Sequence, residues 1–209
     1  MIFSSLTFLF LFLPIVLLLL SVCRRIPYQN TLLFLSSIFF YAWGGVSYTL
    51  ILLLSILVNY VFGLLLQRCE HHKKELLAAA VGINLLSLVF FKYANFIMDN
   101  VNILTSVFDV SPITMRQIVL PIGISFYTFQ GISYLVDVYR RNVQAQTNLI
   151  KLGTYIALFP QLIAGPIIRY HEIEPQLDPE LERMKTSLNE TILADPAEAS
   201  RILISYIKD

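Results

Sequence analysis

Residues 46–66 read VSYTLILLLSILVNYVFGLLL, a run without a single charged side chain. A helix that crosses the hydrocarbon core of a membrane needs roughly 20 mostly apolar residues, and this run supplies them. The rest of the chain follows the same pattern, because 56% of its 209 residues are hydrophobic and only 14% are charged. Together with a mean hydropathy of +0.69, this composition is too apolar for an ordinary water-soluble domain. The sequence therefore predicts an all-α, multi-pass transmembrane protein.

Further apolar runs flank this one, and together they predict a bundle of about six membrane segments. The runs occupy residues 2–22, 28–43, 46–66, 76–96, 119–138 and 149–168. The first run is interpreted as a retained helix and not as a signal peptide, because Arg24 and Arg25 follow it and no small-residue cleavage site does. The last run contains Pro160 and Gly165-Pro166, which predict a broken or re-entrant second half.

Lysine and arginine gather on alternate connections between the apolar runs. Short connections rich in these residues face the cytoplasm. The basic side chains are Arg24, Arg25, Arg68, Lys73, Lys74, Arg140, Arg141 and Lys151. Since the intervening turn at Gly44-Gly45 is uncharged, the pattern predicts an N-terminus outside the membrane.

The composition changes at His171. Residues 172–209 carry nine acidic and four basic side chains and no run that could cross a bilayer. We therefore expect residues 1–171 to form a membrane domain and residues 172–209 to form an acidic, soluble tail. Apolar residues of the tail recur at helical spacing around Asp195-Pro196, which is typical of two short amphipathic helices.

Composition also excludes several classes of function. A formal net charge of +1 leaves no basic footprint for nucleic acid. The two cysteines, Cys23 and Cys69, lie at the ends of apolar runs without metal-ligand spacing, so no metal site is predicted. The three histidines lie outside the apolar runs, and the adjacent His71 and His72 are typical of a solvated surface pair. The sequence has no nucleophile elbow, phosphate loop or apolar pair of carboxylates.

Polar residues inside the apolar runs are candidates for function, because burying them in a membrane is costly. Gln130, Ser133 and Asp137 recur at intervals of three and four, which puts them on one helical face. This face either packs against neighbouring helices through hydrogen bonds or lines a path for a polar substrate. For Asp137, an ion pair with Arg140 or Arg141 is the simplest interpretation.

Four other polar side chains lie within or next to the apolar runs. Lys92 either extends its ammonium group to the membrane surface or contacts a ligand. Arg169 follows the expected break in the last run, where a fixed cation beside irregular backbone suits an anionic or polar ligand, although arginines are also common at membrane edges. Asn59 and Asn84 lie in two facing runs, and we expect them to hydrogen-bond each other in a structural role.

A longer pattern is centred on residues 120–130, LPIGISFYTFQ, and continues with ISY at 132–134 and DVYR at 137–140. Four more stretches accompany it: FSS and FLF within residues 3–10, FYAW at 40–43, FKYANF at 91–96 and FPQLIAGPI at 159–167. In this order they resemble the membrane-bound O-acyltransferase family, and within it the alginate O-acetyltransferase type of bacteria. The resemblance covers residues 1 to about 176 and stops at about residue 177, so the tail is not family-like.

The resemblance implies an enzyme of the bacterial inner membrane that transfers an acyl group, most simply acetyl, to hydroxyls of an extracytoplasmic polysaccharide such as alginate. It also implies a central funnel and tunnel, and a donor that is acetyl-CoA or an acyl carrier in place of a bound cofactor. Membrane lipids, the polysaccharide acceptor and accessory acetylation proteins are the implied partners.

The resemblance also bears on individual residues. Family members carry a catalytic histidine in their second half, and none of the histidines of this chain matches that position. We therefore assign no catalytic residue here and expect the chain by itself to be inactive. The matched positions that could border the acyl or acceptor path are Lys92, Tyr127, Gln130, Gln161 and Arg169.

Several alternatives stay open at this point. The chain is either a truncated or chimeric product of a longer acyltransferase gene, or a family-derived membrane protein with a replaced tail. A different class of function is a non-catalytic scaffold that docks a soluble protein through its acidic tail. A transporter would fit the broken last run and the polar face, although no inverted repeat is visible in the sequence.

Overall fold

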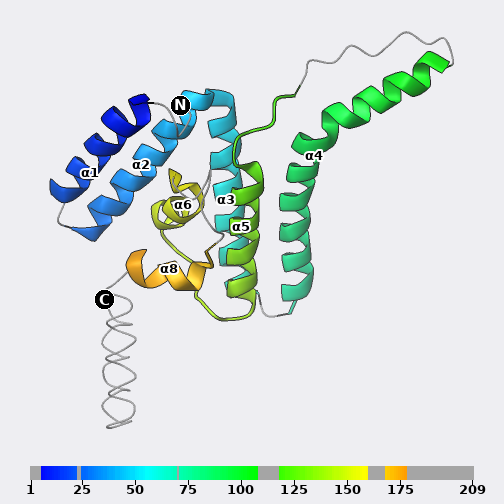
Figure 1. The fold of residues 1–209 in the computed structure, drawn as a ribbon. Helices are drawn as coiled ribbons and strands as arrows, with labels where there is room; N and C mark the ends of the chain where they lie inside the picture. The colour runs from blue at the N-terminus through cyan, green and yellow to red at the C-terminus, as the bar shows by residue number, and fades with distance from the viewer. Residues whose placement is uncertain (1–5, 23–24, 70, 108–117, 160–167, 178–209) are drawn as a thin grey trace. The chain divides into compact units, whose positions relative to one another are not determined.

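The computed structural model describes residues 6–22, 25–69, 71–107, 118–159 and 168–177 (Figure 1). Every regular element within these ranges is a helix, which confirms the all-α prediction. The chain divides into two units, Met1–Tyr170 and His171–Asp209. Two of the described helices are long and apolar enough to cross a membrane, judged by length and composition.

The chain begins with two adjacent helical segments. A π-helical turn, Phe8–Phe12 (η1), leads into α1, Leu13–Val22, and the next helix is α2, Ile26–Gly44. Pro27 lies in the first turn of α2, where its missing N–H would have had no partner inside the helix. The apolar runs that were expected here therefore fold as helices.

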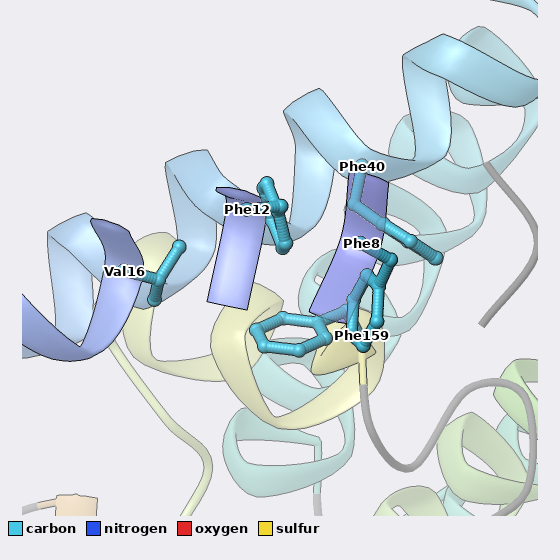
Figure 2. Close-up of a cluster of buried hydrophobic side chains, with 5 residues drawn as sticks. All are labelled: Phe8, Phe12, Val16, Phe40 and Phe159. Atoms are coloured by element: carbon cyan, nitrogen blue, oxygen red, sulfur yellow. The ribbon is translucent and has the colours of Figure 1, made fainter. Parts of the chain in front are cut away.

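A cluster of five buried side chains joins these helices (Figure 2). Phe8, Phe12 and Val16 recur every four residues, so they lie along one face and meet Phe40 of α2. The Phe8 and Phe40 rings are 5.4 Å apart and inclined at 68°, and the Phe12 and Phe159 rings are 5.4 Å apart and inclined at 79°, both in edge-to-face contact. Edge-to-face contact is favourable because the positive rim of one ring meets the negative face of the other. The cluster ties the N-terminal segment to the residues just before position 160.

The helices α3, Val46–Arg68, and α4, Lys73–Val107, form the expected hairpin of two long apolar helices. The parts that meet the length and composition of a membrane span are Val46–Arg68 and Lys73–Ile103. α4 is longer than predicted, because its helix continues without interruption past residue 96. Large apolar side chains stay exposed along both helices, for example Leu54 at 61% and Leu86 at 69%. In water such exposure would be unfavourable, whereas lipid tails would cover it.

Asn59 of α3 and Asn84 of α4 confirm the predicted pair. The Asn59 Nδ2 group donates to Asn84 Oδ1 at 3.1 Å, and the Asn84 Nδ2 group donates back to Asn59 Oδ1 at 3.2 Å. Each Nδ2 group also donates to the carbonyl four residues earlier, that of Ser55 at 2.8 Å or of Ala80 at 2.9 Å. Both asparagines are buried, and both N–H bonds of each amide are used. The pair satisfies groups that would otherwise be costly inside an apolar bundle.

The helix α5, Ile124–Tyr139, packs against both α3 and α4. Two glycines allow its close approach to α3. A Cβ atom at Gly63 would lie 2.5 Å from the Tyr134 hydroxyl, and one at Gly131 would lie 2.6 Å from the Asn59 amide nitrogen. Small residues at a helix contact let the backbones come close enough for such hydrogen-bonding side chains to fit between them.

The next helix that the structure describes is α6, Leu149–Ala157. The Asn148 side chain begins it by accepting from the Ile150 N–H at 2.9 Å, as an N-cap residue does. The helix ends at Ala157, and the Phe159 N–H donates to Ser37 Oγ of α2 at 3.2 Å. The predicted break around residues 160–167 lies outside the described residues.

The extended segment between α5 and α6 is held by side chains of α3 and α5. Gln67 Oε1 accepts from the Ala145 N–H at 2.8 Å, and the Tyr60 hydroxyl donates to the Thr147 carbonyl at 2.7 Å. From α5, the Tyr134 hydroxyl accepts from the Gln146 N–H at 3.0 Å. Backbone groups of a segment without regular structure thus find partners, as buried backbone must.

The second unit contributes one described helix, α8, Tyr170–Leu177, with Glu172 in its first turn and Pro175 inside it. The expected amphipathic helices of the tail lie in residues 178–209, outside the described residues.

Candidate functional site

The stretch that carries the family-like pattern begins as a turn, and the helix starts later than predicted. The Ile124 N–H donates to the Pro121 carbonyl at 3.2 Å, and Gly123 adopts a left-handed conformation with φ of 76°. A side chain at this position would collide with the neighbouring carbonyl, so glycine is the residue that fits. The turn explains why α5 begins at Ile124 and not near residue 119.

Two side chains from distant parts of the chain clamp this turn, which we call the 118–123 loop. Asn95 of α4 donates from Nδ2 to the Ile118 carbonyl at 2.6 Å and accepts from the Ile118 N–H at 3.0 Å. The Asn95 side chain thus pairs with the Ile118 backbone through one donated and one accepted hydrogen bond, as two paired backbone segments do. Tyr41 of α2 donates its hydroxyl to the Ile122 carbonyl at 2.6 Å. The loop is therefore fixed at both ends.

A pocket of about 130 Å³ lies beside the loop, and we call it the loop pocket. Its walls come from the end of α2, the start of α3 and the loop itself: Phe40, Tyr41, Gly44, Tyr48, Val119, Leu120 and Ile122. Most of these side chains are apolar or aromatic. At the α2–α3 turn, a Cβ atom on Gly45 would lie 2.7 Å from the Tyr48 ring, so this glycine leaves room for that wall.

Tyr127 lies next to the pocket wall, on the first turn of α5. Its side chain is buried, and its hydroxyl lies beside that of Tyr41. Among the described residues no group meets the Tyr127 hydroxyl with regular hydrogen-bond geometry. Burying a hydroxyl in this way costs free energy, so Tyr127 is the member of the predicted set with the clearest unsatisfied polar atom.

The predicted polar face of α5 follows Tyr127 along the helix. Gln130 and Asp137 are both buried, and Ser133 between them is half-buried. Asp137 accepts a hydrogen bond from the Asn142 side chain at 3.3 Å. The two interpretations of this face, as a packing surface or as a substrate path, both remain predictions.

None of the predicted site residues that the structure describes is among those that line the loop pocket. Lys92 is exposed on α4, with its ammonium group 5.6 Å from the ring centre of Tyr93. Arg169 is exposed, directly after Ile168, whose carbonyl accepts from the Tyr155 hydroxyl at 2.9 Å. Gln161 lies outside the described residues. Tyr127 thus reaches the wall residue Tyr41 without lining the pocket itself, and Lys92 and Arg169 lie on the surface.

The two histidines of the first unit, His71 and His72, lie away from the pocket. His71 and His72 are exposed beyond the end of α3, and His72 Nδ1 lies 2.8 Å from the Glu75 carboxylate. At a rise of about 1.5 Å per residue, the length of α3 separates them from Tyr48 by roughly 30 Å. His171 belongs to the second unit.

Sequence reasoning missed Tyr41, Tyr48 and Asn95 as parts of this site. Tyr41 and Asn95 lie inside two of the family-like stretches, FYAW and FKYANF. This membership was the sequence signal that could have identified them. Three family-like stretches that are far apart in the chain therefore meet at one loop. An apolar hollow with tyrosine hydroxyls at its wall suits a small apolar group that carries a polar atom at one end.

Comparison with known proteins agrees with this pattern. The chain is 41% identical to a protein of Pseudomonas putida named "Probable alginate O-acetylase AlgI", over 85% of this chain and 37% of that protein. The protein of the same name in Pseudomonas aeruginosa is also 41% identical, over 85% of this chain and 35% of its own length. A "Peptidoglycan O-acetyltransferase" of Helicobacter pylori is 30% identical, over 84% of this chain and 38% of its length.

The chain therefore spans little more than a third of the length of these relatives. No family model and no solved structure matches it. The similarity nevertheless extends over most of the chain, and it includes the stretches that build the 118–123 loop. Over 85% of its length the chain is thus similar to alginate O-acetylases, which agrees with the resemblance of its sequence to the membrane-bound O-acyltransferase family.

Proposed function

We propose that this chain is the N-terminal part of an O-acetyltransferase that transfers acetyl groups to hydroxyls of an extracytoplasmic polysaccharide such as alginate. The observation that carries the proposal is the convergence of FYAW, FKYANF and LPIG on the 118–123 loop, beside which the loop pocket lies. The names of the relatives, which include an alginate and a peptidoglycan acetylating enzyme, support the polysaccharide as acceptor.

The proposal includes about six membrane segments in the bacterial inner membrane, with the N-terminus outside. The basic turn between α3 and α4 then faces the cytoplasm. The loop pocket, which contains Tyr48 at the start of α3, lies at the other end of that helix. It thus belongs to the extracytoplasmic half of the bundle, where a polysaccharide approaches.

In the proposed reaction, the acceptor hydroxyl oxygen forms a bond to the acyl carbon of a thioester donor, acetyl-CoA or an acyl carrier. The bond between that carbon and the donor sulfur breaks. The hydroxyl proton passes to a base, which then gives it to the departing sulfur, so that the donor leaves as a thiol. The apolar loop pocket holds the methyl end of the acetyl group. Tyr127 and Gln130 border the path, with the Tyr127 hydroxyl as a donor toward the acyl oxygen.

This chain is not expected to supply the base. A general base must lie within hydrogen-bond reach of the proton it takes, and His71 and His72 lie roughly 30 Å of helix away from the pocket. The family resemblance assigns the base to a histidine beyond the matched region. We therefore expect no acetyl transfer by the isolated chain, and acetyl esters formed by the purified chain from acetyl-CoA would contradict this part of the proposal.

A chimera tests the proposed function directly. Residues 1–177 of this chain replace the matching portion of the Pseudomonas putida relative in a strain that lacks its own alginate O-acetylase. If the chain is the corresponding part of such an enzyme, the chimera restores acetyl esters on secreted alginate, measured per uronic acid.

The amount of chimera in the membrane is measured alongside, as the control for folding. A chimera that accumulates like the intact relative but yields no acetyl esters would refute the proposed function. A matched variant, Asn95→Leu, removes the clamp on Ile118 and should lower the ester content at an unchanged membrane level.

A further inference from the structure

A basic hollow lies at the end of the bundle opposite the loop pocket. It has a volume of about 560 Å³ and is lined by His71, His72, Lys73, Lys74, Glu75 and Tyr139. The hollow is open and mostly polar, unlike the apolar loop pocket. Figure 1 shows its two sides, the N-terminal end of α4 and the C-terminal end of α5, at the same end of the helices.

Cations dominate this end of the bundle. Lys74 is exposed and Lys73 half-buried, and Arg68 and Arg140 are exposed at the ends of α3 and α5. Two carboxylates belong to the same stretch of sequence. Glu75 lies 2.8 Å from His72 Nδ1, and Glu70 lies outside the described residues. The hollow therefore favours an anion, because neither lysine has a carboxylate partner among the side chains that line it.

The position of the hollow indicates that the anion is the headgroup of a lipid. It lies at the turn that joins the two helices long and apolar enough to cross a membrane, so it sits at the level where hydrocarbon gives way to headgroups. Val61 and Leu65 of α3 are 43% and 38% exposed in the last turns before the hollow, where lipid tails would cover them. Tyr139 at its wall is an aromatic residue of the kind found at membrane surfaces.

We propose that the hollow of Lys73, Lys74 and Tyr139 binds the phosphate headgroup of an anionic phospholipid whose tails lie along α3 and α4. The two ammonium groups contact the phosphate oxygens, and Tyr139 borders the glycerol. A Lys or Arg near an anionic membrane surface strengthens binding by about five-fold, so the two lysines determine most of the preference for an anionic over a zwitterionic lipid.

The test uses the full chain purified in detergent and titrated with phosphatidylglycerol or with phosphatidylcholine that has the same tails. Native mass spectrometry counts the bound lipid. We expect phosphatidylglycerol to be retained in preference to phosphatidylcholine, and each substitution Lys73→Gln or Lys74→Gln to weaken its binding by about five-fold. The matched control is Lys92→Gln, which removes an exposed lysine of the same helix far from the hollow and should leave phosphatidylglycerol binding unchanged.

A second variant keeps the proposal testable if the lysine variants fold poorly. Glu75→Gln removes a carboxylate from the hollow, so phosphatidylglycerol should bind more tightly. Unchanged lipid binding in the folded lysine variants, or weaker binding with Glu75→Gln, would overturn the proposal. Competition by glycerol phosphate at the same concentration as the lipid would also overturn it, because a soluble phosphate would then suffice.

Discussion

Substituting Asn59 and Asn84 by alanine, singly and together, tests how much free energy the amide pair contributes to the contact between α3 and α4. Two hydrogen bonds cross between these helices, at 3.1 and 3.2 Å. Hydrogen bonds between helices of membrane proteins contribute about 0.6 kcal/mol each on average, so the pair should give a coupling energy of about 1.2 kcal/mol. Each single variant should lose more than this, because it also leaves the remaining buried amide without its partner.

The assay is reversible unfolding of the full chain in mixed micelles, followed by helix content, for the parent, both single variants and the double variant. The coupling energy is the amount by which the double variant departs from the sum of the singles. Asn100 provides the control, since its side chain donates locally to the Phe96 carbonyl at 2.6 Å and is exposed. The cycle of Asn59 with Asn100 should be additive within about 0.5 kcal/mol. An Asn59–Asn84 coupling no larger than that of the control would refute the assignment of the pair.

Four single substitutions test other contacts of the fold and of the loop. Gly63→Ala should lower the free energy of unfolding by about 1–3 kcal/mol, since its Cβ would lie 2.5 Å from the Tyr134 hydroxyl. A Cβ atom at Gly82 would meet no neighbouring atom within 4 Å, so Gly82→Ala should raise the free energy of unfolding by up to about 1 kcal/mol in the same assay. A lower free energy of unfolding for this variant would contradict the packing described. Gly123→Ala should cost about 1–2 kcal/mol because φ is 76°, and an unchanged stability would refute the left-handed turn. Tyr41→Phe in the chimera should reduce acetyl ester content at an equal membrane level, and full activity would show that the clamp on the loop is dispensable.

The sequence by itself predicted those features that depend on neighbouring residues and on the membrane. An uncharged run long enough to span the hydrocarbon core has to be helical, because lipid offers no partner to a free backbone group. The same reasoning predicted that Asn59 and Asn84 would meet, since a polar side chain in each of two adjacent apolar helices finds its nearest partner in the other. Both features are present in the structure.

Only the tertiary structure decided where the candidate site lies. Tyr41 and Ile122 are 81 residues apart, and Asn95 and Ile118 are 23 apart, so no local pattern indicates that these residues meet. The start of α5 depends on the same contacts. Pro121 at the beginning of an apolar run is compatible with a helix that starts there. In the structure the two clamps and the left-handed Gly123 fix a turn instead, so the helix begins at Ile124. Tyr41 and Asn95 each belong to a family-like stretch of the sequence. Their meeting at the 118–123 loop is a consequence of how α2, α4 and α5 pack.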